Sequence, residues 1–136
     1  MRCVAACLML AAVAGLSLAA DKTKETYEVE TVKDLAYVEK DADEVRHKLD
    51  LYLPKDTKNY PVLFFIHGGA WRAGSKDGFA GHGKTFASHG IGFVATNYRL
   101  SPKVKHPDHA KDVAAAFAFA RKELKKRGAD VSQIYV

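Results

Sequence analysis

The sequence predicts an α/β fold in which antiparallel lead-in strands precede a mainly parallel sheet with helices on both faces. Two strand-like stretches, residues 62–66 and 90–98, are almost wholly apolar, which is typical of strands covered on both faces. An amphipathic helix pattern separates the second stretch from a third apolar run at 133–136. Strands that alternate with helices in this order form parallel sheets.

The lead-in strands are expected at residues 34–38 and 47–54, after a polar segment at 21–30. In the second of these strands Leu49, Leu51 and Leu53 alternate with other residues, and this period of two predicts one buried face. The polar stretch 39–45 between the strands predicts a turn, so the two strands form an antiparallel pair.

Two helices are expected between the parallel strands, at residues 79–89 and 108–128. In the longer one Val113, Phe117, Ala120 and Leu124 fall on one face of a 3.6-residue period. Asp108 is a candidate N-cap, and Gly128 is placed to end this helix.

Residues 1–20 resemble a signal peptide, so residues 21–136 would form the exported, mature domain. Arg2 precedes an apolar run, and either Ser17-Leu18-Ala19 or Ala20 offers a cleavage site. The protein would then be periplasmic or extracellular, with no stable membrane insertion after cleavage. Both cysteines, Cys3 and Cys7, lie in this segment, so the mature chain would have no disulfide and no thiolate metal site.

The formal net charge of the 136-residue chain is +5, and basic residues cluster at 121–128. A solvated helix end explains this cluster better than a site for an anionic partner, because cations complement the helix dipole there. No aromatic residues lie among these charges to stack on bases, so no nucleic-acid partner is expected.

The strand at 62–66 leads directly into His67, Gly68 and Gly69. Active sites of open α/β sheets lie beyond the carboxyl ends of the strands. Glycines there allow close backbone approach, and consecutive N–H groups can donate to an oxyanion. His67 is expected to orient this loop through side-chain hydrogen bonds. Trp71 is expected either to pack beneath the loop or to line the substrate pocket.

Three motifs resemble the α/β-hydrolase superfamily, specifically its esterase/lipase branch with an HGG[GA]W oxyanion motif. They are HGGAW (67–71), NYRLSP (97–102) and the helix that contains Asp112. The resemblance implies the amino-terminal half of an α/β-hydrolase fold, with oxyanion-hole N–H groups from Gly68, Gly69 and Ala70. It also implies hydrolysis of a small-molecule or polymer-linked carboxylic ester through an acyl-serine, with no metal or organic cofactor.

Tyr98 and Arg99 are expected to support the loop, and Asp112 to accept a hydrogen bond from loop to helix rather than act as the catalytic acid. In this branch the serine nucleophile lies in a G-x-S-x-G turn, which this chain lacks. The serines present lack flanking glycines and are expected to be loop or cap residues; they include Ser75, Ser88, Ser101 and Ser132.

The nucleophile, acid and histidine are therefore expected beyond Val136, and the chain is interpreted as a fragment truncated before the nucleophile turn. We expect it to be inactive alone and poorly stable, because its last strand would leave an exposed edge. The alternative is a non-catalytic module, derived from the hydrolase fold, that binds a ligand or partner.

Two further patterns are interpreted as coincidental. Residues 78–85 match a phosphate-binding loop, but no strand precedes them directly. Four histidines lie near one another in sequence, without the spacing of a metal site, and are expected to be surface or loop residues. They are His82, His89, His106 and His109.

Overall fold

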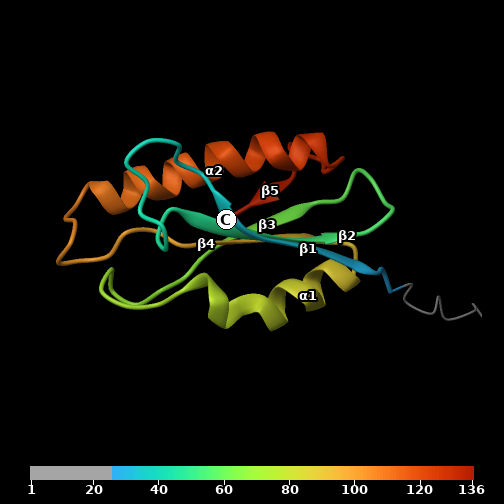
Figure 1. Cartoon of the computed structure of the whole chain (residues 1–136). Helices are drawn as coiled ribbons and strands as arrows, with labels where there is room; N and C mark the ends of the chain where they lie inside the picture. The colour runs from blue at the N-terminus through green and yellow to red at the C-terminus, as the bar shows by residue number, and fades with distance from the viewer. Residues whose placement is uncertain (1–25) are drawn as a thin grey trace, which may run out of the picture.

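A computed structural model describes residues 26–136, so the predicted signal peptide and both cysteines lie outside the described residues. Five strands form one sheet, in the order β1-β2-β4-β3-β5. The elements are β1 (Val29–Ala36), β2 (Lys48–Pro54), β3 (Val62–Ile66), the 3-10 helix η1 (Lys76–Phe79), α1 (Ala80–Ser88), β4 (Gly92–Thr96), α2 (Asp108–Lys126) and β5 (Ile134–Tyr135) (Figure 1). Neither helix of the described part combines the length and apolar character that crossing a membrane requires.

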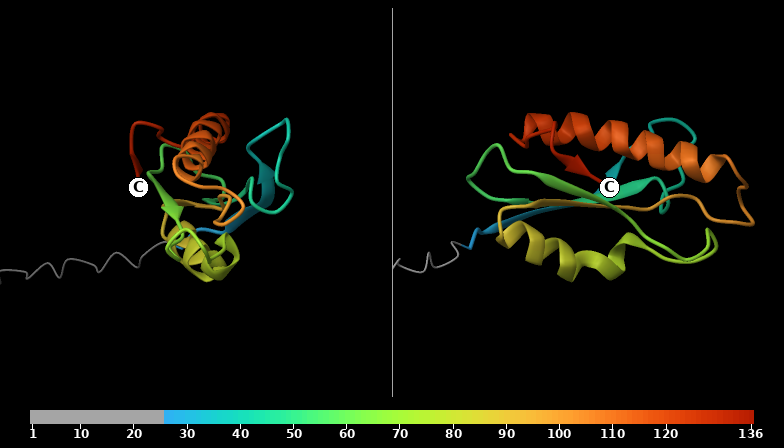
Figure 2. Two further views of the ribbon diagram at one scale, coloured as in Figure 1. Left: turned by 90° about the vertical axis from the view of Figure 1, so that its left-hand side faces the viewer. Right: turned by 180° about the vertical axis from the view of Figure 1, so that it is seen from behind.

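The sheet is mixed, as the sequence predicts. Strand β1 pairs antiparallel with β2, and β2 pairs antiparallel with β4. Strand β3 pairs parallel with both β4 and β5. The two helices cover opposite faces of the sheet (Figure 2). This arrangement confirms the predicted fold class, the amino-terminal half of an α/β-hydrolase.

The first strand begins earlier than predicted, at Val29 rather than residue 34. Val29 pairs with Pro54, so part of the supposed polar lead-in belongs to the sheet. The ladder bonds use backbone groups, which are available whatever the side chains are. A bulge between Val32 and Leu35 interrupts the pairing, and Asp34 within it has a φ of 58°.

The prediction of one buried face for β2 is wrong, because both faces are buried. Leu49, Leu51 and Leu53 pack in the core beneath α2, as expected. Tyr52 is 1% exposed and packs toward α1, and Asp50 is fully buried. The strand has neighbours on both edges and a helix over each face, which the alternation of leucines alone did not reveal.

The long helix α2 presents its predicted apolar stripe to the sheet, where Ala120 and Leu124 are buried and Phe117 packs against them. Its ends differ in how well they were predicted. Asp108 does not cap the helix: it is the first helical residue, and Pro107 holds the cap position without a side-chain bond. Gly128 follows the helix with a φ of 87°, which confirms its role at the end.

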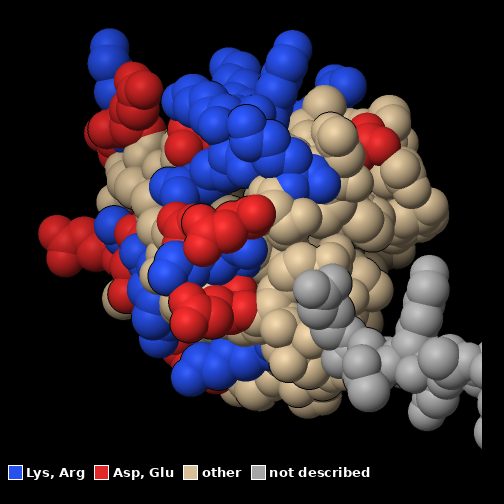
Figure 3. Space-filling view, turned by 90° about the vertical axis from the view of Figure 1, so that its right-hand side faces the viewer, with Lys and Arg blue, Asp and Glu red and all other residues tan. Residues whose placement is uncertain are grey.

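The basic segment at the carboxyl end of α2 is exposed and lies at the end of the molecule away from the loop that follows β3 (Figures 1 and 3). Lys126 pairs with Glu123 on the same helix, and Arg127 pairs with Glu30 of β1. Residues 78–85 do not form a phosphate-binding loop in the structure. Gly78 lies in η1, and the lysine of the pattern, Lys84, lies within α1.

Candidate active site

The loop after β3 has an unusual backbone. Gly69, Ala70, Trp71 and Gly74 all have positive φ, at 122°, 50°, 58° and 104°. A Cβ on Gly69 would collide with the carbonyl group of Ala73, so only glycine fits there. The chain thus turns tightly and leaves the backbone of the loop open on one side.

His67 holds this loop from within the protein. It is 2% exposed, and its Nδ1 donates to the carbonyl oxygen of Gly68 at 2.8 Å. The imidazole stacks on the ring of Tyr98, with centroids 4.5 Å apart. The Tyr98 hydroxyl in turn donates to the backbone carbonyl of His67 at 3.0 Å. The histidine therefore has the position and the hydrogen bond expected of a loop-orienting residue.

Trp71 lies at the open side of the loop. Its side chain is 62% exposed, so of the two predicted placements the structure shows the one at the pocket. Its backbone carbonyl accepts a hydrogen bond from the N–H of Ser101 at 2.8 Å. Its indole lies 6.5 Å from the imidazole of His109, measured between ring centroids.

A cavity of about 1130 Å³ lies between the end of β3, this loop and the amino-terminal half of α2. All five residues that the sequence singled out for the site line it, and most of the remaining lining is apolar. The lining residues are Phe64, Ile66, His67, Gly68, Gly69, Ala70, Trp71, Tyr98, Ser101, Lys105, His106, His109, Ala110, Val113, Ala114, Phe117 and Val136. Pockets of this size and character commonly bind small molecules.

Four consecutive residues of the cavity lining have backbone N–H groups without a partner. The N–H groups of Gly68, Gly69, Ala70 and Trp71 make no hydrogen bond with any residue in 26–136. The carbonyl oxygen of Gly69, by contrast, accepts from both Arg72 and Ala73. Fixed N–H groups at a cavity wall can stabilise a developing negative charge on oxygen.

Asp112 anchors the next loop to α2. It accepts three hydrogen bonds from Arg99, from its backbone N–H, Nε and Nη2, at 2.7–3.0 Å. The Nε2 of buried His47 lies 3.3 Å from the same carboxylate. Burial alone would raise the pKa of Asp112, but the hydrogen bonds and charge of Arg99 lower it overall. These contacts confirm the prediction that Arg99 supports the loop and Asp112 accepts its bonds.

A buried lysine, which sequence reasoning missed, secures the far end of the loop. Lys76 is 3% exposed, and its ammonium contacts the carboxylates of Asp34, Asp50 and Asp77 at 2.8–3.2 Å. Burial alone would lower the pKa of Lys76, but these three partners raise it above its usual value. The backbone N–H of Lys76 also donates to Asn97 at 2.7 Å, which ties this loop to the loop after β4.

Sequence reasoning also missed the burial of His109, which it assigned to a surface or loop position, whereas Ser101 lies in a loop as expected. His109 lies in the first turn of α2, is 6% exposed, and its Nε2 lies 3.3 Å from the Ser101 hydroxyl oxygen. The sequence did contain one signal for this burial. His109 lies four residues before Val113, so it lies on the same face of the helix and extends the apolar stripe of α2 by one turn. Within residues 26–136 no group of three or more histidine, aspartate or glutamate residues could hold a metal ion.

The chain is similar to several known esterases. Its residues 49–136 match the BD-FAE family. It is 36% identical over 95 residues to a probable isoprenylcysteine alpha-carbonyl methylesterase of Oryza sativa subsp. japonica, a match that covers 69% of this chain and 23% of that protein. It is 38% identical over 98 residues to the esterase LipC of Mycobacterium tuberculosis, with 69% and 24% covered.

Among solved structures, esterase B from Lactobacillus rhamnosis superimposes with a TM-score of 0.71 at 27% identity. That match covers 78% of this chain and 34% of the esterase. The chain thus spans about a quarter of the length of the curated relatives it matches. The family match and the shared architecture agree: the chain belongs to the BD-FAE family and has the amino-terminal half of an α/β-hydrolase esterase fold.

Proposed function

We propose that this chain supplies the oxyanion side of an exported serine carboxylesterase, which hydrolyses a small-molecule or polymer-linked ester through an acyl-serine intermediate. One observation carries the proposal. Gly68, Gly69 and Ala70 line a largely apolar cavity at the carboxyl end of a parallel strand, and their N–H groups have no partner among residues 26–136. Such donors are worth most in a site that excludes water.

In this mechanism the substrate carbonyl lies against the loop at 67–71. When a nucleophile attacks, the carbonyl oxygen becomes an oxyanion and accepts hydrogen bonds from Gly69, Ala70 and Gly68. His67 and Gly69 keep the loop in the conformation that exposes these groups. The relatives' names, which describe esterases, support this assignment.

The nucleophilic serine, the acid and the catalytic histidine are proposed to follow Val136 in a longer protein. Strand β5 pairs parallel with β3, and Val136 directly after it already lines the cavity. A G-x-S-x-G turn a few residues further on would bring its serine toward the same cavity. This chain alone is then expected to show no serine-dependent esterase activity.

The first experiment is to read the gene beyond the codon for Val136 and to express any continuous frame. The proposal expects a G-x-S-x-G sequence and turnover of p-nitrophenyl butyrate that a fluorophosphonate abolishes. A stop codon directly after Val136 would instead favour the non-catalytic binding module.

A substitution in the expressed protein tests the loop itself. Gly69→Ala should lower kcat about 100-fold. The added methyl group would collide with the carbonyl group of Ala73 and displace the loop, and the loss of one oxyanion hydrogen bond typically lowers kcat by about this factor. Gly78→Ala is the matched control, since a Cβ there meets nothing within 4 Å and the residue lies outside the cavity lining. Equal activity of the two variants would contradict the assigned loop.

The export signal can be tested independently. If residues 1–20 are a signal peptide, the protein recovered from outside the cytoplasm should begin at residue 20 or 21. Its amino-terminal sequence or intact mass measures this directly. A secreted product that retains Met1 would contradict the assignment.

A further inference from the structure

Among residues 26–136, one charged side chain lines the cavity, and it is a cation: Lys105 lies in the lining, and no aspartate or glutamate does. The lining also contains the imidazoles of His67, His106 and His109. Most other lining residues are apolar, so few competing polar groups surround the ammonium group of Lys105. A cavity bordered by one sign of charge attracts a ligand of the opposite sign.

Lys105 differs from the other cations of residues 97–111 because it has no ion pair with any residue of the described chain. Two residues earlier, Lys103 pairs with Asp43 at 2.6 Å. Arg99 pairs with Asp112 at 2.7 Å, and Lys111 pairs with Asp108 at 3.3 Å. Of the cations in this segment, Lys105 is thus the one that lines the cavity with its charge unneutralised.

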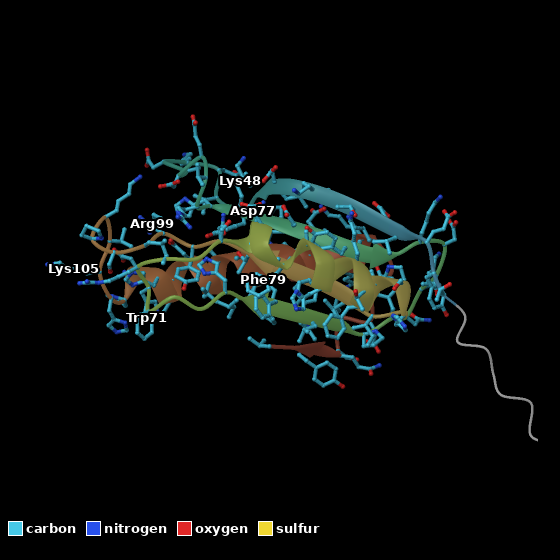
Figure 4. The ribbon with its side chains drawn as sticks, turned by 90° about the horizontal axis from the view of Figure 1, so that it is seen from below. Lys48, Trp71, Asp77, Phe79, Arg99 and Lys105 are labelled. Carbon is cyan, nitrogen blue, oxygen red and sulfur yellow. The ribbon has the colours of Figure 1, made fainter. Side chains whose placement is uncertain are left out.

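Lys105 and Trp71 lie at the same end of the molecule, where the loops after β3 and β4 meet (Figure 4). Both side chains are exposed, and both line the cavity. They therefore form part of its open rim. A ligand that enters there meets an indole, an ammonium group and, behind them, the apolar walls from β3 and α2.

We infer that the ester substrate carries a carboxylate, which Lys105 binds at the rim while the ester group lies against the loop at 67–71. This inference rests on the proposed function, because it names the substrate class of the same site. Trp71 would contact the apolar part of the substrate between the two groups. The substrates would be half-esters of dicarboxylic acids or similar acidic esters.

Trp71 is the single tryptophan of the 136-residue chain, so its fluorescence reports binding at the rim directly. Two probes of equal size separate charge from shape. They are monomethyl suberate, which carries a carboxylate, and the methyl ester of suberic acid monoamide, which carries a neutral carboxamide. Titration of the full chain with each probe, at low salt and at 1 M NaCl, gives the two dissociation constants.

The anionic probe is expected to bind about fivefold more tightly at low salt, the upper range for one exposed charge pair. This preference should disappear at 1 M NaCl and in Lys105→Met, and Lys105→Glu should reverse it. Lys103→Met is the matched control and should keep the preference, because Lys103 does not line the cavity. Circular dichroism confirms that each variant is folded.

The outcomes are distinct. If both probes bind equally to the parent chain and to Lys105→Met, the inference is wrong while ester binding in this cavity stands. If neither probe changes the Trp71 fluorescence, both the inference and the proposed ester site fail. If Lys103→Met loses the preference as fully as Lys105→Met, the effect is one of net charge, and the role of Lys105 is refuted.

Discussion

The two faces of the sheet are held in different ways. On the α1 face, four phenylalanine rings pack in sequence: Phe79 on Phe65, Phe65 on Phe93, and Phe93 on Phe86, with centroids 4.3–5.7 Å apart. On the α2 face, the carboxyl-terminal half of the helix buries the aliphatic side chains of Ala120 and Leu124, whereas its amino-terminal half borders the cavity. There the helix is anchored by the hydrogen bonds of Asp112.

The difference shows how one sheet can be rigid and still provide a site. Aromatic packing closes the α1 face, where no lining residue of the cavity lies on the helix. At the open end of the α2 face one aromatic pair, Phe64 and Phe117, packs edge to face. The helix is also held there by charge-assisted hydrogen bonds, which are strong and directional. A cavity can therefore remain at the carboxyl ends of the strands without loosening the helix that borders it.

The largest effect is expected from removing the anchor of the open face. Asp112→Ala leaves Arg99 and His47 without their shared partner and should lower the free energy of unfolding by about 3 kcal/mol. Asp108→Ala, in the same helix but partly exposed, should cost about 0.5 kcal/mol. Urea denaturation of both variants measures the contrast. Equal losses would mean that Asp112 is not the anchor.

The same substitution on each helix compares the packing of the two faces. Ala87→Phe, at a fully buried position of α1, should destabilise the protein by about 2 to 3 kcal/mol through overpacking. Ala114→Phe, on the cavity side of α2, should change stability by less than about 0.5 kcal/mol. Thermal unfolding distinguishes them, and a large loss from Ala114→Phe would show that this face is closed after all.

Two glycines of α1 sharpen the comparison further. A Cβ on Gly83 would collide with the ring of Tyr52, whereas a Cβ on Gly81 would meet nothing within 4 Å. Gly83→Ala should therefore cost about 1 kcal/mol despite the better helix propensity of alanine. Gly81→Ala should stabilise the protein by about 0.5 kcal/mol. The prediction fails if both substitutions shift the urea midpoint in the same direction.

The smallest effect concerns pH and the loop near the open face. The hydrogen bond from Lys103, together with backbone donors, lowers the pKa of Asp43 from 3.8 to about 2. The folded state thus disfavours protonation, so this contribution is complete above pH 4 and is lost as the pH falls toward 2. In Lys103→Met the free energy of unfolding should decrease less steeply between pH 5 and pH 3. The difference should be less than about 1 kcal/mol, since Lys103 is exposed. Urea unfolding at pH 5, 4 and 3 tests it, and an unchanged slope would refute the pairing.

Sequence patterns predicted the elements whose signal is local. The apolar run before His67, the apolar face of α2 and the glycine after it were all found where expected. The loop at 67–71 lies beside the cavity, because a strand that ends in His-Gly-Gly delivers these residues to the carboxyl edge of its sheet. Its role as the oxyanion loop stays a prediction.

The errors concern residues whose surroundings come from elsewhere in the chain. The prediction of one buried face placed Asp50 on the solvent side of β2, but in the structure Asp50 is buried and pairs with Lys76. The bulge that brings Asp34 to the same lysine had no signature in the sequence. His109 was assigned to the surface although it belongs to the buried stripe of its helix.

The sequence by itself determined the order of strands and helices and the loop that carries the candidate oxyanion donors, because backbone propensity and hydrophobic period act over a few residues. Only the tertiary structure decided which charges are buried, which are paired and which face the cavity. The burial of Lys76 follows from contacts between segments far apart in sequence, and so does the position of Lys105, which has no ion-pair partner among residues 26–136. The electrostatic character of the site is therefore a property of the fold rather than of any motif.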